Sequence, residues 1–134
     1  MTTIAFTVPG KPAPQGSKRH VGRGMMVESS KELGPWRERV ALCAHNAMCG
    51  RSLLDGAVRV RLDLTLPRPK SAPKRSTPPA VKRPDVDKLA RAILDAITGI
   101  IVRDDSQIVD LHATKRLAEL GETPGVAITV ELVA

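Results

Sequence analysis

Four aspartates lie between residues 85 and 105 of a strongly basic chain, and their type and spacing indicate metal chemistry. Asp85 and Asp87 are two residues apart, and Asp104 and Asp105 are adjacent. Carboxylate oxygens suit Mg²⁺ and Mn²⁺, and a divalent cation relieves the repulsion between converging carboxylates. We expect the second pair to return toward the first and complete a metal site. The alternative for each aspartate alone is a helix cap or a surface ion pair.

A helix must position these carboxylates. Asp87 is a suitable cap for a helix over residues 88–98, which Gly99 would end. The polar residues of this helix, which include Lys88, Arg91 and Asp95, fall within an arc of about 100° on a helical wheel. A helix that is apolar around the rest of its circumference needs cover on two sides. We therefore expect the sheet on one side and a second subunit on the other, which predicts a homodimer.

The remaining chain predicts one small α+β domain spanning residues 1–134. Alternating apolar residues predict strands over residues 4–8, 58–66, 108–117 and 126–132, the last two as an antiparallel hairpin. Apolar residues three and four apart predict a helix over residues 30–49, with Ser30 as its cap and Trp36 in the core. The order is β-α-β-(basic arm)-α-β-β, with two main helices on one face of a mixed or antiparallel sheet.

Two basic segments lack the composition of a core. Residues 67–84 hold six prolines and six cations without an acidic residue, which predicts a flexible basic arm. Residues 10–24 are rich in Gly, Pro, Lys and Arg, and we expect them to contact phosphates without packing into the core. The cations expected to bind DNA in and near these segments are Lys11, Lys18, Arg19, Arg68, Lys70, Lys74, Arg75, Lys82, Arg83 and Lys88.

The overall composition limits the classes of molecule that the protein is expected to bind. A net charge of +7 and a pI near 10 favour a polyanion, most commonly nucleic acid. Aromatic residues make up 1% of the chain, which nearly excludes base stacking on aromatic side chains. The sequence has no run of 18 apolar residues and no signal peptide, so we expect a soluble, intracellular protein without a membrane partner.

The motifs around the aspartates resemble the RusA family of Holliday junction resolvases, and the match runs through nearly the whole chain. They are Arg83-Pro84-Asp85-Val86-Asp87-x-Leu89, Leu94-Asp95-Ala96-Ile97-Thr98-Gly99, and Asp104-Asp105-Ser106-Gln107-Ile108 with Lys115. The segments Gly10-Lys11-Pro12 and Ser17-Lys18-Arg19 also resemble the opening of that family. The resemblance implies a homodimeric endonuclease of a bacterial or phage-infected cytoplasm that nicks four-way DNA junctions symmetrically in two strands. It implies dependence on Mg²⁺ or Mn²⁺ and on no small-molecule cofactor.

The resemblance also assigns roles to individual residues. It implies that Asp85, Asp87 and Asp105 bind the metal. The family's site lysine falls on Arg91, and the Asn that commonly follows the second carboxylate is Lys88 here. Arg91 can stabilise charge on a phosphoryl group but does not donate a proton, so water or Lys88 would have to serve as the acid.

Three more residues are expected to support this site. Asp95 and Asp104 are expected behind the metal ligands, where Asp95 could hold Arg91 or Lys88 in place. Lys115 matches the family, and we expect it near the site or the DNA.

The expected reaction is phosphodiester hydrolysis in recombination and repair. Its expected catalytic residues are Asp85, Asp87 and Asp105, which would hold the cation, and Arg91, which would stabilise the phosphate. Two alternatives remain. The first is a metal-dependent nuclease acting on flap or other branched DNA, and the second is a non-enzymatic basic DNA-binding protein whose aspartates are caps.

Overall fold

The computed structural model describes residues 2–16, 19–21, 25–27 and 31–133, with no side-chain description for residues 19–21 and 25–27. Six strands, two α-helices and one short 3₁₀-helix follow one another in this part of the chain. They are β1 (Thr3–Pro9), β2 (Arg19–Val21), β3 (Met25–Val27), α1 (Leu33–Met48), β4 (Val58–Leu66), α2 (Val86–Ile97), η1 (Asp105–Gln107), β5 (Ile108–Leu117) and β6 (Gly125–Leu132). The antiparallel pair of β2 and β3 forms a separate small sheet that the sequence did not predict.

The main sheet is mixed and has the strand order β1-β6-β4-β5. Strand β6 is antiparallel to both β1 and β4, whereas β4 and β5 are parallel. The predicted α+β class with two helices and a mixed sheet is confirmed, but the predicted hairpin is wrong because β4 lies between β5 and β6. Parallel strands need a long crossover, and the segment from the arm through α2 provides one between β4 and β5.

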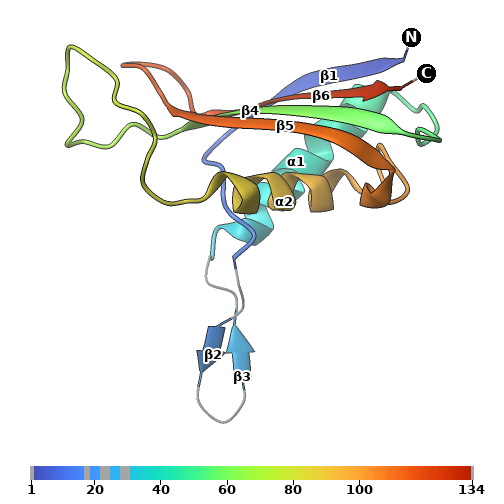
Figure 1. Cartoon of the computed structure of the whole chain (residues 1–134), viewed down its shortest axis with the longest axis horizontal. Coiled ribbons are helices and arrows are strands. Elements are labelled where there is room, and N and C mark those ends of the chain that lie inside the picture. The colour runs from blue at the N-terminus through green and yellow to red at the C-terminus, as the bar shows by residue number, and fades with distance from the viewer. Residues whose placement is uncertain (1, 17–18, 22–24, 28–30, 134) are drawn as a thin grey trace.

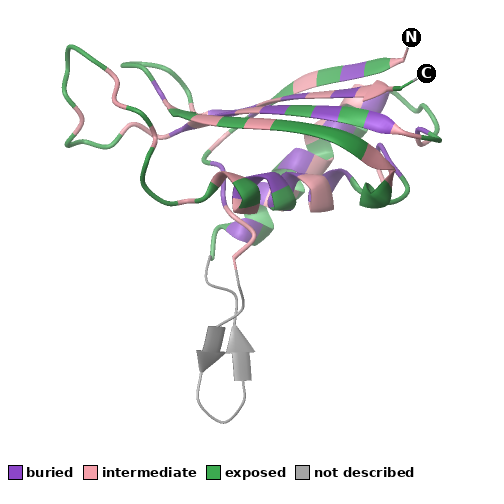
Figure 2. Cartoon of the chain, viewed as in Figure 1, coloured by how far each residue is buried: buried purple, intermediate pink, exposed green. Residues whose placement is uncertain are grey.

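The alternation in β4 separates a buried face from a wet face, as predicted. Val58, Val60, Leu62, Leu64 and Leu66 are all buried, while the residues between them are exposed or half-buried. Figure 2 shows this banding of purple with green and pink along the strand. The sheet therefore presents its apolar face to the helices and its polar face to solvent.

The wet face of the sheet carries ion pairs across the strands. Arg59 Nε donates to Asp110 Oδ2 at 2.8 Å, and Arg59 Nη1 donates to Glu131 Oε1 at 2.9 Å. These contacts join β4 to both of its neighbours. The basic side chain on β4 thus has an acidic side chain beside it on β5 and another on β6.

Both α-helices lie on one face of the main sheet (Figure 1). The sheet and α1 together bury the apolar side chains of α2. The buried residues of α2 are Leu89, Ala90, Ala92, Ile93, Ala96 and Ile97. Its apolar circumference is thus covered by the sheet and by α1 within one chain, so the wheel gives no reason to expect a second subunit against this helix. On α1, Trp36 is buried in the core as predicted.

Several boundaries differ from the prediction. Helix α1 begins at Leu33 with Glu32 at its N-cap, and Ser30 lies outside the described residues. Helix α2 begins at Val86, so Asp85 is its N-cap and Asp87 lies in its first turn. The segment after β1 does reach the core, since Ala13 is completely buried. Within the described residues, neither α-helix has the length and apolar character that a membrane span requires.

Candidate active site

Asp85 occupies the N-cap position of α2 without capping it. Its backbone is extended (φ −72°, ψ 143°), as a cap requires, but its carboxylate accepts no hydrogen bond from the first turn. The carboxylate is exposed, and Lys88 Nζ lies 3.7 Å from Asp85 Oδ2. Asp87 is also exposed, and it forms no hydrogen bond or ion pair with the part of the chain that is described. Two carboxylates are therefore presented at one end of α2, free of a capping role.

Lys115 braces the segment that carries Asp85. Its Nζ donates to the carbonyl oxygens of Lys82 at 2.9 Å and Pro84 at 2.8 Å. Lys115 pairs with Leu64 in the β4–β5 register, so it lies in the row that faces the helices. A lysine ammonium has three donors, and two of them are used here on the backbone just before Asp85. The structure thus gives this predicted DNA contact a bracing position.

A second brace holds the first turn of α2. The backbone N–H of Gln15 donates to the carbonyl oxygen of Lys88 at 2.9 Å. Because residues 11–16 follow β1 directly, this bond ties the amino end of α2 to the segment that leaves the sheet edge. The conformation of the Asp85–Asp87 segment is therefore fixed from two sides.

The second aspartate pair is arranged differently. Asp104 is the N-cap of η1 and does act as one, because its Oδ1 accepts from the Ser106 N–H at 3.0 Å. Gln107 completes the capping box: its Oε1 accepts from the N–H groups of Arg103 and Asp104, and its Nε2 donates to the carbonyls of Leu54 and Gly56. Asp104 therefore has a structural role, which leaves Asp105 as the available carboxylate of the pair.

The hydrogen bonds around Asp104 and Asp105 shift the pKa values of these two carboxyl groups in opposite directions. Hydrogen bonds from the Ser106 backbone, and then from Asp105, lower the pKa of Asp104. The same shared hydrogen bond is the main cause that raises the pKa of Asp105, followed by desolvation and by the charges of Asp104 and Asp95. Asp105 thus lies within electrostatic reach of Asp95, in the second half of α2.

The two aspartate pairs do not converge within one chain. Asp87 and Asp95 are eight residues apart on α2, which is about 12 Å along the helix axis. In Figure 1 the amino end of α2 lies beside the arm, and η1 lies beyond its carboxyl end. Within the described residues, no group of three or more His, Cys, Asp or Glu side chains is placed to hold a metal ion. The expectation that Asp104 and Asp105 return to the amino end is wrong for the single chain.

The register of the sheet explains this separation. The Leu54 N–H donates to the carbonyl oxygen of Ile101 at 2.8 Å, which fixes the turn after α2 beside the start of β4. Because β5 runs parallel to β4, it must begin at this same end, where Val58 pairs with Ile108. Asp105 precedes β5 by three residues, so it is held at the carboxyl end of α2.

The remaining predicted residues on α2 form no ion pair with one another in the described part of the chain. Arg91 is exposed on the solvent side of the helix. Lys88 pairs with Asp85, and no ion pair in the described part of the chain joins Asp95 to Arg91 or Lys88. The predicted support of Arg91 by Asp95 is therefore not seen.

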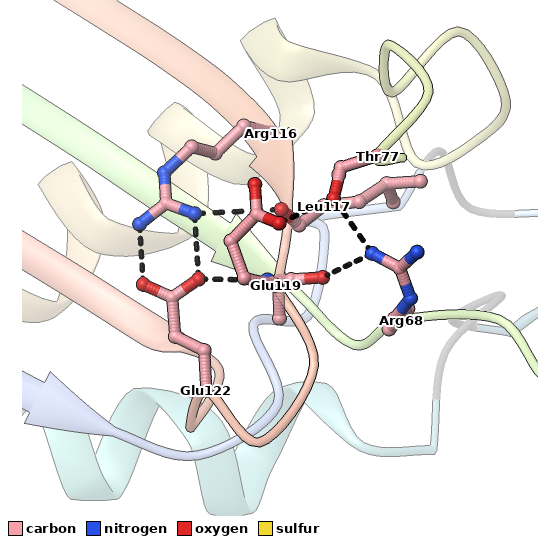
Figure 3. A network of polar contacts seen from close by, with 7 residues as sticks. Arg68, Thr77, Arg116, Leu117, Glu119 and Glu122 are labelled. Carbon is pink, nitrogen blue, oxygen red and sulfur yellow. Dashed lines mark hydrogen bonds and ion pairs between the residues drawn. The ribbon is translucent and has the colours of Figure 1, made fainter. Parts of the chain in front are cut away.

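Arg68 folds the basic arm onto the body of the protein (Figure 3). Its Nη1 donates to Thr77 Oγ1 at 2.7 Å and to the Ala118 carbonyl at 3.1 Å, and its Nη2 donates to the carbonyls of Pro73 and Ser76. Thr77 Oγ1 in turn donates to Glu119 Oε2 at 2.6 Å. This role could not be predicted from the sequence, because one arginine in a run of cations carries no signal that distinguishes it.

The other cations predicted to bind DNA are distributed around this end. Lys70, Lys74, Arg75, Lys82 and Arg83 are exposed on the arm. Lys11 is exposed and forms an ion pair with Glu32 at 3.3 Å. Lys18 and the side chain of Arg19 lie outside the described residues.

A groove of about 1060 Å³ lies next to Asp85. It is formed by the segment after β1, the arm, the ends of β4 and β5, and the amino end of α2. Cations from three of these segments line it, namely Lys11, Lys82, Arg83 and Lys88. The exposed carboxylate of Asp85 therefore stands at the edge of a cationic groove.

Comparison with known proteins agrees with this arrangement. The family described as Endodeoxyribonuclease RusA matches residues 9–131, which include α1, α2, η1 and the whole candidate site. The chain is also 32% identical over 131 residues to the uncharacterized protein YqaN of Bacillus subtilis (strain 168), a match that covers 89% of this chain and 91% of that protein. Together with the carboxylates and cations described above, these similarities show that the chain belongs to the RusA family of endodeoxyribonucleases.

Proposed function

We propose that this chain is a metal-dependent, structure-specific endodeoxyribonuclease that resolves four-way DNA junctions during recombination and repair. The observation that carries the proposal is the carboxylate of Asp85, which stands at a helix N-cap, does not cap, and lies at the edge of a cationic groove. A cap worth roughly 1 kcal/mol is commonly used at such a position. Its absence here supports a ligand role for Asp85, and family membership supports the nuclease activity.

The donor set fits Mg²⁺ or Mn²⁺. Asp85, Asp87 and Asp105 provide hard carboxylate oxygens, and all three side chains are exposed. When bound, such a cation would polarise the scissile phosphate and make a water molecule more acidic. The hydrogen bond shared with Asp104, then desolvation and the charges of Asp104 and Asp95, raise the pKa of Asp105, and a bound cation would offset this effect.

The proposed roles of the cations follow from their positions. The guanidinium of Arg91 is exposed on α2 one turn after Asp87, where it would neutralise charge that develops on the phosphate. Lys88 balances Asp85 in the free protein and would move to the DNA backbone when a cation takes its place. The arm cations Lys70, Lys74 and Arg75 would neutralise further phosphates, so affinity would fall steeply with salt.

We further propose that the enzyme is a homodimer whose metal sites are shared between subunits. Strand β5 is at the edge of the main sheet, and it exposes two apolar residues, Val109 (63% exposed) and Leu111 (45% exposed). Unpaired edges of this kind recruit a second strand. Two copies of β5 paired antiparallel across a two-fold axis would bring the start of one strand to the end of the other. Asp105 of the partner subunit would then approach Asp85 and Asp87.

Two such sites on one two-fold axis suit a substrate with its own two-fold symmetry. Each site would nick one strand, and the two nicks would be symmetric about the junction centre. A flap has no two-fold axis, so this symmetry favours the four-way junction among branched substrates, whereas a linear duplex has local two-fold axes and must be separated by experiment.

Comparing three substrates tests the proposal. A mobile four-way junction, a flap and a linear duplex of the same sequence are incubated with the protein, with and without Mg²⁺, beside the Asp85→Asn variant. We expect paired nicks in the junction only, in the presence of Mg²⁺ only, and none with the variant. Equal cleavage of the linear duplex would overturn junction resolution. DNA binding without any Mg²⁺-dependent cleavage would support a non-enzymatic binding protein instead.

A further inference from the structure

The groove beside Asp85 has a lining unlike that of a surface that binds duplex DNA. Thirteen of its twenty-one lining residues are proline, leucine, alanine or valine, and eight of the eleven prolines in the chain are among them. Proline has no N–H donor and a fixed φ, so these walls are rigid and offer apolar rings instead of hydrogen bonds. The groove volume of about 1060 Å³ lies just above the range for small-molecule sites, roughly 300–1,000 Å³.

The lining matches an unpaired nucleotide strand better than a duplex. A duplex presents its phosphates outward, and an apolar wall would remove water from them without replacing the hydrogen bonds. An unpaired strand can lay the faces of its bases on apolar or guanidinium surfaces while its phosphates meet cations. The groove offers both: apolar walls from the arm and the segment after β1, and Lys82 and Arg83 beside them.

The arm is held in place to form this groove. Arg68 joins Thr77 and the carbonyls of Pro73 and Ser76, so the two sides of the arm are tied together, and Thr77 ties the arm to Glu119. At its other end the arm leads through Pro84, whose carbonyl is bound by Lys115, directly to Asp85. A strand lying in the groove would therefore leave it at the carboxylates.

We propose that this groove is a binding site for unpaired single-stranded DNA, which holds the nucleotides next to the phosphate that is cut. The inference rests on the proposed function, because it takes the groove occupant to be part of the DNA substrate. Since the prolines provide no donors to base edges, the site binds bases of any type through their faces. It selects DNA in which bases can leave the stack, as at a branch point.

Val81 and Leu42 provide a matched pair of variants to test this site. Val81 lines the groove and is 82% exposed, whereas Leu42 lies on α1 away from the groove and is 61% exposed. Val81→Glu and Leu42→Glu both exchange an exposed apolar side chain for a carboxylate, so they change the net charge equally. Fluorescence anisotropy with a labelled eight-nucleotide thymidine strand and a labelled duplex, without divalent cations, measures binding independently of cleavage. Thermal unfolding checks that both variants fold.

We expect Val81→Glu to weaken binding of the single strand about tenfold, the scale of one lost base contact, and Leu42→Glu to weaken it much less. For Val81→Glu, duplex binding should fall much less than single-strand binding, because the duplex does not enter the groove. Equal loss of single-strand affinity in the two variants would overturn the groove assignment, as would an equal loss on single strand and duplex for Val81→Glu. If the selective loss is seen but no branched DNA is cleaved, the groove stands and the proposed nuclease substrate fails. If the junction is cleaved but the loss of affinity is not selective for the single strand, the proposed nuclease function stands and the groove assignment fails.

Discussion

The two ends of α2 carry the same type of residue and use it in different ways. At the arm end, which comprises residues 67–88 together with Lys115, the structure is held by Lys115 and Gln15 acting on backbone carbonyls, and the carboxylates have no capping role. At the capped end, which comprises residues 98–107, one carboxylate of the pair is itself the brace: Asp104 caps η1. A carboxylate at a helix N-cap position therefore caps in one case and does not cap in the other, depending on where the hydrogen bonds of the segment come from.

The same difference bears on the proposed metal site, whose carboxylates are exposed at both ends of α2 but do not meet within one chain. Lys115 and the Gln15 N–H hold the backbone around Asp85, so its carboxylate makes no capping hydrogen bond. In the same way, Asp104 caps η1, so the Asp105 carboxylate is not needed as its cap. Each end of α2 therefore has exposed carboxylates, and the fold holds the two groups apart. In the proposed homodimer, the second subunit joins them.

The largest expected effect comes from removing one carboxylate at either end. Asp85→Asn and Asp105→Asn should each reduce junction cleavage by more than about 100-fold, beyond the loss that follows from outer-shell changes at metal sites. If the sites are shared between subunits, an equal mixture of the two variants should recover about a quarter of the activity, because half of the dimers are mixed and each has one intact site. Single-strand nicking of a labelled junction after co-refolding measures this.

Mixing distinguishes the two arrangements because an unshared site gives a different result. A mixed dimer with a separate site in each subunit has one damaged carboxylate in each, and it would remain inactive. Mixing either variant with wild-type protein serves as the control for subunit exchange. An inactive variant mixture beside a normal exchange control would therefore contradict the shared site.

A smaller effect is expected from loosening the arm end. Lys115→Met removes the donor to the carbonyls of Lys82 and Pro84, so the segment that carries Asp85 loses its brace. We expect cleavage to fall about 10- to 100-fold at low Mg²⁺ and to recover in part at high Mg²⁺. Titration of the Mg²⁺ dependence of cleavage, together with DNA binding in its absence, measures the two roles separately.

The arm residue Lys74 provides the control for this prediction. Lys74 is exposed, and Lys74→Met removes the same charge without touching the segment before Asp85. It should weaken DNA binding and leave the Mg²⁺ requirement unchanged. If Lys115→Met instead lowers DNA affinity as much as Lys74→Met does and leaves the Mg²⁺ requirement unchanged, Lys115 is a phosphate contact and not a brace.

The sequence was sufficient where a local pattern determines the structure. The alternation in residues 58–66 gave β4 and its two faces, and the family motifs placed the aspartates around α2. Strand neighbours are set by long-range packing, so the parallel pairing of β4 with β5 could not be read from two alternating runs. That one pairing decides where Asp105 lies, and it is why the expected convergence of carboxylates failed.

Side-chain roles were harder to predict than elements. Arg68 was assigned from its charge, Lys115 from its match to the family and Asp104 as a support of the metal ligands. Each is used instead for hydrogen bonds to backbone or to a hydroxyl. Nothing in a single sequence reports which carbonyls a lysine or arginine will meet after folding. Such assignments need the register of the sheet first.

At the capped end, stability should change more than activity. Asp104→Ala removes the acceptor for the Ser106 N–H, so the first turn of η1 loses its cap. We expect a lower urea midpoint of unfolding, with cleavage retained at saturating Mg²⁺. Asp105→Ala should show the opposite pattern, with unfolding unchanged and cleavage lost. Equal urea midpoints for the two variants would contradict the division of roles between these neighbours.

The smallest expected effect concerns the acid stability of the turn between β5 and β6, which holds the arm through Glu119. Hydrogen bonds from Arg116, and then from the Glu119 N–H, lower the pKa of Glu122 from 4.5 to about 2. Because the pKa is lower in the folded state, the pair stabilises the fold fully above about pH 4.5, and this contribution is lost as the pH falls toward 2. Glu122→Gln should therefore reduce the thermal midpoint at pH 7 and flatten its decrease between pH 4.5 and 2. Glu38→Gln on α1 is the control. Curves for Glu122→Gln and Glu38→Gln that stay parallel across this interval would show that acid stability does not depend on the Arg116–Glu122 ion pair.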